Sequence, residues 1–524
     1  MRAFWSGARL ALLGAAVALA FADSSIVVLA LPALLRRFDT SIQNVAWIVT
    51  SYNVVVVVVA FPLVWAVQRS DPARLARYGL AVFAVASLGC AFSPSLWTLV
   101  ACRSVQGLGG AALLAGSLPL ARALARDPDR GAARWAVAGA FGAALGPAAG
   151  GALTELFDWR AIFLVQAPMA AVALLGTVGR SVVPEQVTTC HLDGRLRRLG
   201  ANAALALLSG ALVGALFLVV VLLIDVWGYS PLRAAAVVSA IPVGTLVARL
   251  ARTTRSTAAG SLLLAGGLGA LALVPGRNEA WVAAALALCG LGLGLAVPAL
   301  TSSAGPWSVA ARHAGLVAAL LLLTPLLAHD LSAATTRAEQ TGTALVLDAP
   351  IDVGTKVPLA TELAAGIARA PNGDLPDLAP VFVKHESDPG VRQLEHSLDV
   401  EIRAVVTHAF RRSFLLSALL ALAVAAPLAL RPRRAVVPAA VAAGALLVAE
   451  LSAGGLSYGN AAARNPCRPP PTVSGSGIDR NAQRLVLRGM DEVACHTGAS
   501  REQLLLDLAD EGTKAKRWAD RIFG

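Results

Sequence analysis

The stretch FADSSIVVLALPALL, Phe21–Leu35, places a single aspartate, Asp23, inside a long apolar segment. Between Gly7 and Leu35 the only other ionisable residue is Arg9, close to the start of the segment. A charged side chain at the centre of a bilayer costs about 2.5–3.5 kcal/mol on insertion scales, so it is retained where it has a partner or a task. The stretch therefore predicts a membrane-spanning helix with a functional carboxylate, and carrying a proton is the expected task.

The composition extends this prediction to the whole chain. Of 524 residues, 56% are hydrophobic and 15% are charged, and the mean hydropathy is +0.67. Unbroken apolar runs of about 20 residues recur, as in proteins that cross the membrane many times. The sequence predicts an all-α integral membrane protein with about 13 transmembrane helices. The expected spans are Ala8–Leu34, Val45–Val67, Leu75–Phe92, Leu96–Leu118, Ala133–Leu153, Ile162–Val178, Ala203–Ile224, Ala234–Leu250, Ala258–Val274, Trp281–Leu300, Val309–Ala328, Phe414–Leu430 and Val436–Leu451. The first run is too long for a cleavable signal peptide, so it is expected to span the membrane itself.

The basic residues fall on alternate connections between these spans. The net charge is +12, but arginines concentrate in the loops on one side, such as Arg122, Arg126 and Arg130, whereas the short loops opposite contain few. By the positive-inside rule the N-terminus is cytoplasmic, and with 13 spans the C-terminal tail lies outside. The charge thus reflects membrane topology, and no nucleic-acid partner is expected.

Two segments lie outside the apolar runs. Residues 331–410 form a proline-rich outer insertion, in which Val391–Ala409 is expected to be helical, and residues 457–524 form an outer tail. In the tail, Ser500 is expected to cap a helix. Cys467 and Cys495 are the only cysteines of the tail, so we expect a disulfide between them, with two free thiols as the alternative.

Five strings stand out in the first half of the chain. They are DSSIVVLALP (Asp23–Pro32), WIVTSYN (Trp47–Asn53), RSVQGLGGAA (Arg103–Ala112), GAALGPAAGG (Gly142–Gly151) and DWRAIFLVQAP (Asp158–Pro168). The glycine spacing allows close packing of helices, and Pro147 bends or weakens its helix where two bundles would meet. Arg103 is a second costly charge, expected to face the interior and to pair with backbone carbonyls or an acid.

The five strings in this order resemble the major facilitator superfamily, and within it the drug:proton antiporters with fourteen spans. The resemblance implies two six-helix bundles around a cavity that opens alternately to each side. It implies that Asp23 is the proton-coupling site, that Arg103 modulates it, and that a hinge for antiport is formed by Gly142, Gly146, Pro147, Gly150 and Gly151. Candidate residues for lining the substrate cavity are Trp47, Tyr52, Asn53, Gln106 and Phe141.

The resemblance also divides the chain. The expected parts are a first bundle at residues 1–180, a cytoplasmic linker at 181–199, a second bundle at 200–434 that contains the insertion at 331–410, an additional transmembrane helix at 435–456 and the outer tail at 457–524. The sequence departs from the family in the loop VWAVQRSDPARLARYG, where Gln68 replaces the aspartate of the cytoplasmic gate. Arg69 matches the family, and Asp71 is expected to substitute for the missing acid. Val28 stands where the family has an asparagine, and the two helices usually found between the bundles are missing from the expected spans.

Three functions remain open from the sequence. The first is proton-coupled export of lipophilic or amphipathic small molecules. The second is export of an envelope lipid or metabolite, with an envelope partner for the outer tail, and the third is a non-transporting receptor or scaffold on a degenerate transporter fold. No enzyme activity and no cofactor are expected, because the glycine runs lie inside spans and do not follow strands. The arginine- and alanine-rich composition indicates a bacterium, and hence its cytoplasmic membrane.

Overall fold

The computed structural model describes residues 2–67, 69–178, 192–250, 256–349, 351, 356, 359–360, 362–363, 382, 389–429, 435–460, 467, 478–498 and 500–507. In these residues every regular element is a helix. The chain forms two compact units: Met1–Leu327 with Arg411–Gly455, and Ala328–Phe410 with Leu456–Gly524. The first unit contains the apolar helices, and the second contains most of the two segments that lie outside the apolar runs.

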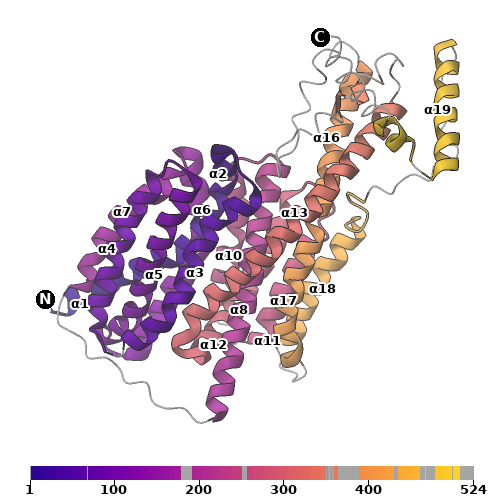
Figure 1. The fold of residues 1–524 in the computed structure, drawn as a ribbon. Coiled ribbons are helices and arrows are strands. Elements are labelled where there is room, and N and C mark those ends of the chain that lie inside the picture. Colours follow the sequence, from indigo (N-terminus) through magenta and orange to yellow (C-terminus); the bar gives the residue numbers. More distant parts are fainter. Residues whose placement is uncertain are drawn as a thin grey trace. The chain divides into compact units, whose positions relative to one another are not determined.

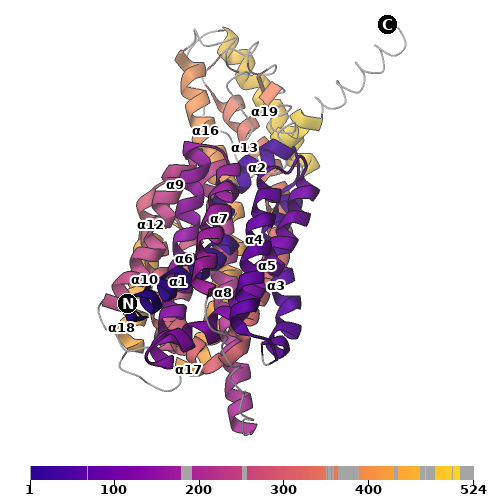
Figure 2. The same ribbon diagram turned by 90° about the vertical axis from the view of Figure 1, so that its left-hand side faces the viewer.

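The first half of the membrane unit is built from seven α-helices and two short 3-10 turns. They are α1 (Arg2–Ile26), η1 (Val28–Ala30), α2 (Leu31–Phe38), α3 (Ile42–Ala66), α4 (Pro72–Ala91), α5 (Leu96–Leu124), α6 (Pro128–Leu156), α7 (Arg160–Ala173) and η2 (Leu174–Thr177). Helix α5 packs against α4 and α3, and α1 packs lengthwise against α6 (Figures 1 and 2). The buried core of this half is formed by Leu, Val, Ala and aromatic side chains from α1, α3, α4, α5, α6 and α7.

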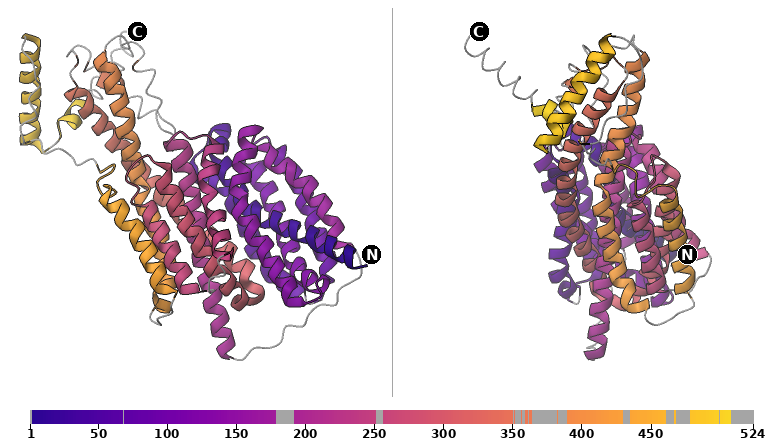
Figure 3. Two further views of the ribbon diagram at one scale, coloured as in Figure 1. Left: turned by 180° about the vertical axis from the view of Figure 1, so that it is seen from behind. Right: turned by 90° about the vertical axis from the view of Figure 1, so that its right-hand side faces the viewer.

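The second half contains the later apolar helices. They are α8 (Leu192–Val221), the π-turn η3 (Leu222–Val226), α9 (Pro231–Val238), α10 (Ala240–Leu250), α11 (Thr257–Leu271), α12 (Glu279–Ala304), η4 (Gly305–Trp307), α13 (Ser308–Asp348), α17 (Arg411–Ala429) and α18 (Val436–Ser452). Helix α11 lies against α12, α17 and α18, and the orange pair α17 and α18 is seen from behind in Figure 3. The first turns of α8 extend beyond the neighbouring helices (Figures 1 and 2).

The apolar segments expected from the sequence are helical in the described part of the chain. Eleven helical stretches are long and apolar enough to cross a membrane, and two shorter apolar helices, α11 and α18, complete the set. The first span differs from the expectation, because it is interrupted by η1 between α1 and α2. The eleventh also differs, because α13 continues beyond Ala328 as one helix to Asp348.

Local sequence signals set where many of these helices begin. Ser95 accepts a hydrogen bond from the backbone N–H of Thr98 (3.3 Å) at the start of α5, and Ser256 caps α11 in the same way. Asp71 and Asn278 cap α4 and α12. These side chains satisfy N–H groups that would otherwise be unpaired at a helix N-terminus.

The second unit joins the insertion and the tail. Its helices are the part of α13 from Ala328, α16 (Pro389–Ala409) and α19 (Ile478–Thr497). The α16 bounds confirm the helix expected at Val391–Ala409, and Ser500 accepts a hydrogen bond from the N–H of Gln503 (3.1 Å), as the capping box predicts. Arg501 of the tail donates to Asp348 (2.8 Å) and is almost completely buried. Two segments that are far apart in sequence therefore share one core.

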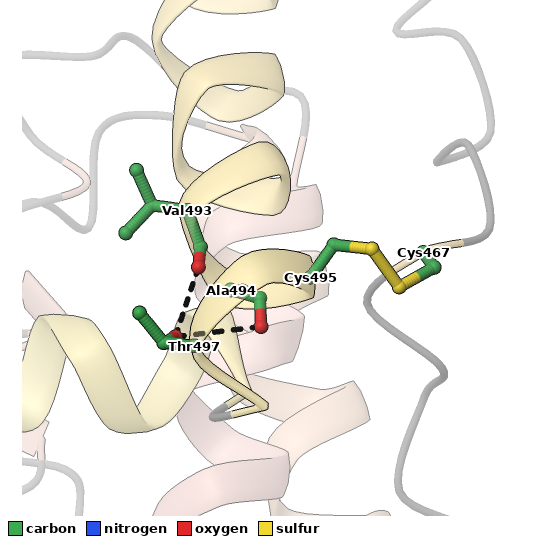
Figure 4. Close-up of a disulfide and its surroundings, with 5 residues drawn as sticks. All are labelled: Cys467, Val493, Ala494, Cys495 and Thr497. Carbon is green, nitrogen blue, oxygen red and sulfur yellow. Dashed lines mark hydrogen bonds between the residues drawn. A yellow bond between two sulfur atoms is a disulfide. The ribbon is translucent and has the colours of Figure 1, made fainter.

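The disulfide between Cys467 and Cys495 is confirmed. Cys495 lies in the last turn of α19, and its side chain points toward Cys467 (Figure 4). In the same turn, the hydroxyl of Thr497 donates to the carbonyl of Val493 (2.8 Å). Among the described residues the free cysteines are Cys90, Cys102 and Cys289, all in apolar helices; Cys190 lies outside the described residues.

Replacing Cys467 by serine is expected to loosen α19. The bond closes a sequence separation of 28 residues, and such a crosslink stabilises a chain by about 3–4 kcal/mol in the chain-entropy picture. Limited proteolysis of the full-length protein should therefore cut within Ile478–Thr497 about 100-fold faster or more in the variant. Reduction of the wild type with dithiothreitol should reproduce the effect, and Cys102→Ser should not. Equal cutting rates in all proteins would show that the disulfide does not hold this helix.

Candidate functional site

Asp23 and Arg103 form a fully buried ion pair in the first half of the membrane unit. Asp23 lies in the last turn of α1, just before η1, and Arg103 lies on α5. Both side chains have no exposed surface, and Arg103 Nη1 donates to Asp23 Oδ2 at 2.6 Å. Arg103 Nη2 also donates to the backbone carbonyl of Asp23 (3.2 Å), and its Nε donates to the carbonyl of Ile48 on α3 (3.1 Å). The guanidinium thus ties three helices together.

Two buried glutamines complete the network around the carboxylate. Gln166 of α7 donates from Nε2 to Asp23 Oδ1 (2.8 Å), so both carboxylate oxygens are hydrogen-bonded. Gln106, one turn after Arg103, accepts from Arg103 Nη1 (2.6 Å) and donates to Gln166 Oε1 (2.8 Å). The Ser87 hydroxyl of α4 is a further acceptor for Gln106 (2.8 Å). Five helices therefore contribute polar groups to one buried network.

Tyr52 forms one wall of this network. Its ring lies 4.7 Å from the Arg103 guanidinium carbon, which is a cation–π distance. Its hydroxyl donates to the carbonyl of Ala20 on α1 (3.1 Å). Phe163 of α7 lies on another side of the guanidinium, at 5.8 Å. Aromatic faces thus surround the charge where it is not paired with the carboxylate.

The network matches the ionised form of Asp23. An ion pair without solvent is tolerated only when hydrogen bonds satisfy both partners, and removing the charge of one partner leaves the other uncompensated. Uptake of a proton by Asp23 would leave Arg103 as an unpaired buried cation. The arrangement of α1, α3, α5 and α7 around Asp23 thus fits the ionised carboxylate.

The glycine run of α6 positions the stretch that bears Asp23. A side chain at Gly146 would lie 2.7 Å from the carbonyl of Ala22, and one at Gly150 or Gly142 would collide with the carbonyl of Ile26 or Ala18. Ser25 also donates to the carbonyl of Ala143 across this contact (3.1 Å). These three glycines allow close packing within one half, against α1. Their role in a hinge for antiport stays a prediction. The helix α6 continues through Pro147.

Gly151 alone of the run faces the second half. A Cβ at this position would lie 2.7 Å from the carbonyl of Pro231, at the start of α9. Nearby, Arg36 at the end of α2 pairs with Asp225 of η3 (3.1 Å). The N–H of Leu232 donates to Glu155 at the end of α6 (3.4 Å). The two halves are therefore in contact at the end of the bundle where α2 and α6 end and α9 begins.

The remaining candidate residues take different positions. Asn53 is completely buried next to Tyr52, whereas Trp47 and Phe141 are 39% and 58% exposed and lie outside the buried network. Asp71 caps α4 by accepting from the N–H of Ala73 (3.0 Å), and Arg69 is exposed in the turn before it. Gln68 lies outside the described residues. A role of Arg69 and Asp71 as a gate stays a prediction.

Sequence reasoning missed Gln166, Ser87 and His313, which the structure places in or next to the network. Gln166 gave a usable signal, since it is an amide in the middle of the apolar helix RAIFLVQAPMAAVA. Ser87 gave none, because a serine in an apolar helix ordinarily bonds its own backbone, as Ser87 also does with Phe83 (2.8 Å). His313 gave no clear signal, because it lies beside Arg312 near the start of an apolar run, and only the structure shows that it is buried.

The fold and this network define a polytopic helical protein whose intramembrane charges face the interior, as in secondary transporters. Comparison of the sequence with family models places the chain in the major facilitator superfamily, with residues 13–325 matched. The protein therefore belongs to this superfamily of multi-pass membrane proteins.

Drug resistance proteins are among the curated relatives that the chain matches. It is 31% identical over 201 residues to the multidrug resistance protein Stp of Mycobacterium tuberculosis, covering 37% of each chain. It is 36% identical over 179 residues to the multidrug efflux pump LfrA of Mycolicibacterium smegmatis, covering 34% of this chain and 35% of the relative. The match thus spans little more than a third of their length.

Solved structures confirm the fold. A bacterial homologue of the human lysosomal transporter Spinster, crystallised in an inward-facing and unoccupied conformation, superposes with a TM-score of 0.56. The superposition covers 85% of this chain and 98% of the homologue at 15% sequence identity. At this identity the likeness concerns the fold alone.

Proposed function

We propose that this transporter exports amphipathic small molecules in exchange for protons, with Asp23 as the proton carrier. The observation that carries the proposal is the buried pair of Asp23 and Arg103, a titratable acid held inside the membrane unit by a cation (2.6 Å). Such intramembrane acids mark proton pathways in pumps and transporters. The names of the relatives, multidrug resistance protein and multidrug efflux pump, support amphipathic drugs as the class of substrate.

The geometry suggests how proton and substrate are exchanged. When Asp23 is ionised, Asp23 and Arg103 neutralise each other within the network. A proton on Asp23 releases Arg103 and favours another arrangement of the helices around it. Since α6 packs against the stretch that bears Asp23 and also contacts α9 through Gly151, a change at Asp23 reaches the second half through α6. Antiport then follows if substrate and proton favour opposite arrangements.

The charges and the disulfide support one orientation in the bacterial cell membrane. Disulfides persist in oxidising compartments, which supports a position outside the cytoplasm for the unit that contains Cys467 and Cys495. The excess of arginine in alternate loops supports an N-terminus inside the cell. Both arguments agree, since a tail outside and an N-terminus inside require an odd number of spans.

Transport by the purified full-length protein in liposomes tests this proposal. We expect a fluorescent lipophilic cation to accumulate only when a pH gradient is imposed, and a protonophore to abolish the accumulation. A one-unit gradient corresponds to about 1.4 kcal/mol, and thus to about tenfold accumulation of substrate for each proton exchanged. Accumulation that survives the protonophore would contradict proton coupling. Failure of the folded protein to move any such cation would contradict the substrate class.

The second unit favours one other cargo, an envelope lipid or a similar amphiphile. This unit has its own buried core and a disulfide, and transport of a drug alone does not require such a domain. In the same liposomes, gradient-driven transfer of a fluorescent phospholipid analogue without transfer of the cation would favour this cargo and an envelope partner for the tail. Transfer of the cation alone would exclude it.

A further inference from the structure

A buried histidine of the second half is inserted into the first half. His313, near the start of α13, is buried, and its Nδ1 lies 2.6 Å from Oδ1 of Asn53 on α3. The two residues are 260 positions apart. This hydrogen bond therefore connects the two halves at a point away from the contact between Arg36 and Asp225.

Three side chains of the first half contact His313. Phe21 of α1 stacks on the imidazole, with 6.3 Å between ring centres and 18° between planes, and Tyr52 lies at 6.2 Å and 58°. Asn53 supplies the hydrogen bond. Phe21 is two residues before Asp23, and the Tyr52 ring contacts Arg103 (4.7 Å). The Tyr52 ring thus contacts both the ion pair and His313.

The hydrogen bonds fix the proton on the imidazole. The Asn53 amide donates from Nδ2 to the carbonyl of Val49 (2.7 Å), which leaves its Oδ1 as the acceptor. His313 Nδ1 must therefore carry the proton and donate it. In a neutral imidazole Nε2 is then an acceptor, and among the residues that the structure describes it is buried without a hydrogen-bond partner. A protonated ring would keep the bond to Asn53 but would bury a charge and an unpaired Nε2–H, so the contact favours the neutral ring.

The charged groups around His313 add to this preference. On its own helix, Arg312 is the adjacent residue, and its guanidinium carbon lies 4.7 Å from the centre of the Phe21 ring. From α3 the titratable group is Tyr52, whose hydroxyl is already bonded to Ala20. Asp23 and Arg103 form their own neutral pair on the Tyr52 side. A proton on Nε2 would therefore meet a neighbouring cation and no acceptor.

We propose that His313 is a proton-controlled link between the two halves. As a neutral ring it holds α13 against Phe21, Tyr52 and Asn53, and its protonation breaks this contact and separates the halves there. Only the role of this link in transport rests on the proposed proton-coupled function. In that role, a proton that leaves Asp23 would open this contact when it reaches His313. In the separated state the imidazole is free and has a pKa of about 6.5, whereas the closed contact disfavours the proton. The equilibrium for closing the link therefore weakens by about tenfold for each pH unit below about 6.5.

The link can be measured without any substrate. Spin labels at Ser70 in the first half and Leu250 in the second half, both exposed, report the separation of the halves in the full-length protein, after Cys90, Cys102, Cys190 and Cys289 are replaced by alanine. We expect the distance distribution to shift to longer values between pH 8 and pH 5.5. His313→Gln, which keeps an amide donor for Asn53 and cannot be protonated in this range, should retain the short distance at both values.

A permanently charged residue provides the converse test. His313→Lys should show the long distance at both pH values, and Asn53→Ala, which removes the acceptor, should shift the distribution toward the long distance at pH 8. A shift in His313→Gln that equals the wild-type shift, or a short distance in His313→Lys, would overturn the proposal. Because neither result depends on transport, failure of the link and failure of the proposed antiport are separable: the liposome assay reports the second alone.

Discussion

Replacing Arg103 by leucine is expected to destabilise the membrane unit by about 3–5 kcal/mol, the cost of removing one partner of a buried ion pair. The substitution leaves the Asp23 carboxylate without its cation, and the carbonyl of Ile48 and the amide of Gln106 without their donor. The expected result is a large drop in the midpoint of thermal unfolding in detergent. Adding Asp23→Asn should recover part of the loss, since the uncompensated charge is then removed.

The matched control is an exposed pair. Arg130 lies 3.4 Å from Asp127, and both side chains are largely exposed, so Arg130→Ala should change stability by less than about 1 kcal/mol. If Arg103→Leu were no more destabilising than this control, the pair would not be buried as the structure has it. If the double variant were as unstable as the single one, the charge of Asp23 would not be the cause.

Replacing Gly150 by alanine is expected to disrupt the contact between α6 and α1. The added methyl group would collide with the carbonyl of Ile26, which is backbone and cannot turn away. Overpacking of this kind costs about 1–3 kcal/mol. It would also displace the stretch that carries Asp23, so transport should fall more than the amount of folded protein does. Thermal unfolding and the liposome assay on the same preparation measure the two effects.

Gly14 offers a control on the same pair of helices. A Cβ there would lie 3.8 Å from Ala138 Cβ, an ordinary contact, and alanine favours a helix over glycine by up to about 1 kcal/mol. Gly14→Ala should therefore leave the unfolding temperature unchanged or raised. Equal effects of Gly14→Ala and Gly150→Ala would mean that close approach of the backbones is not what the glycine run provides.

The spans were predictable because hydrocarbon tolerates few alternatives to an apolar helix. The break between α1 and α2 was not, since it depends on packing of η1 against α6 and against the second half. The core shared by the insertion and the tail was not predictable either, because contacts between segments far apart in sequence leave no local sequence pattern. The disulfide was the exception, since the tail contains a single pair of cysteines.

The candidate site could be predicted from the sequence only for residues that cost free energy inside the membrane. Asp23 and Arg103 are charges in apolar helices, and their cost implies a partner. Glu450 of α18 is a costly charge for which the sequence indicates no partner. In the described part of the structure it is buried and neither carboxylate oxygen has a hydrogen-bond partner. Gln166 and His313 carry no charge penalty that would have drawn attention to them, and only the packing of helices reveals their positions.

The measurement that tests the central claim most directly is proton release by the purified protein in weak buffer when a lipophilic cation is added. If Asp23 carries the exchanged proton, binding of substrate should release protons from the wild type, and Asp23→Asn should bind the same compound without release. The exposed variant Asp158→Asn should behave as the wild type. Equal release by Asp23→Asn and the wild type would contradict the assignment of Asp23 as the proton carrier.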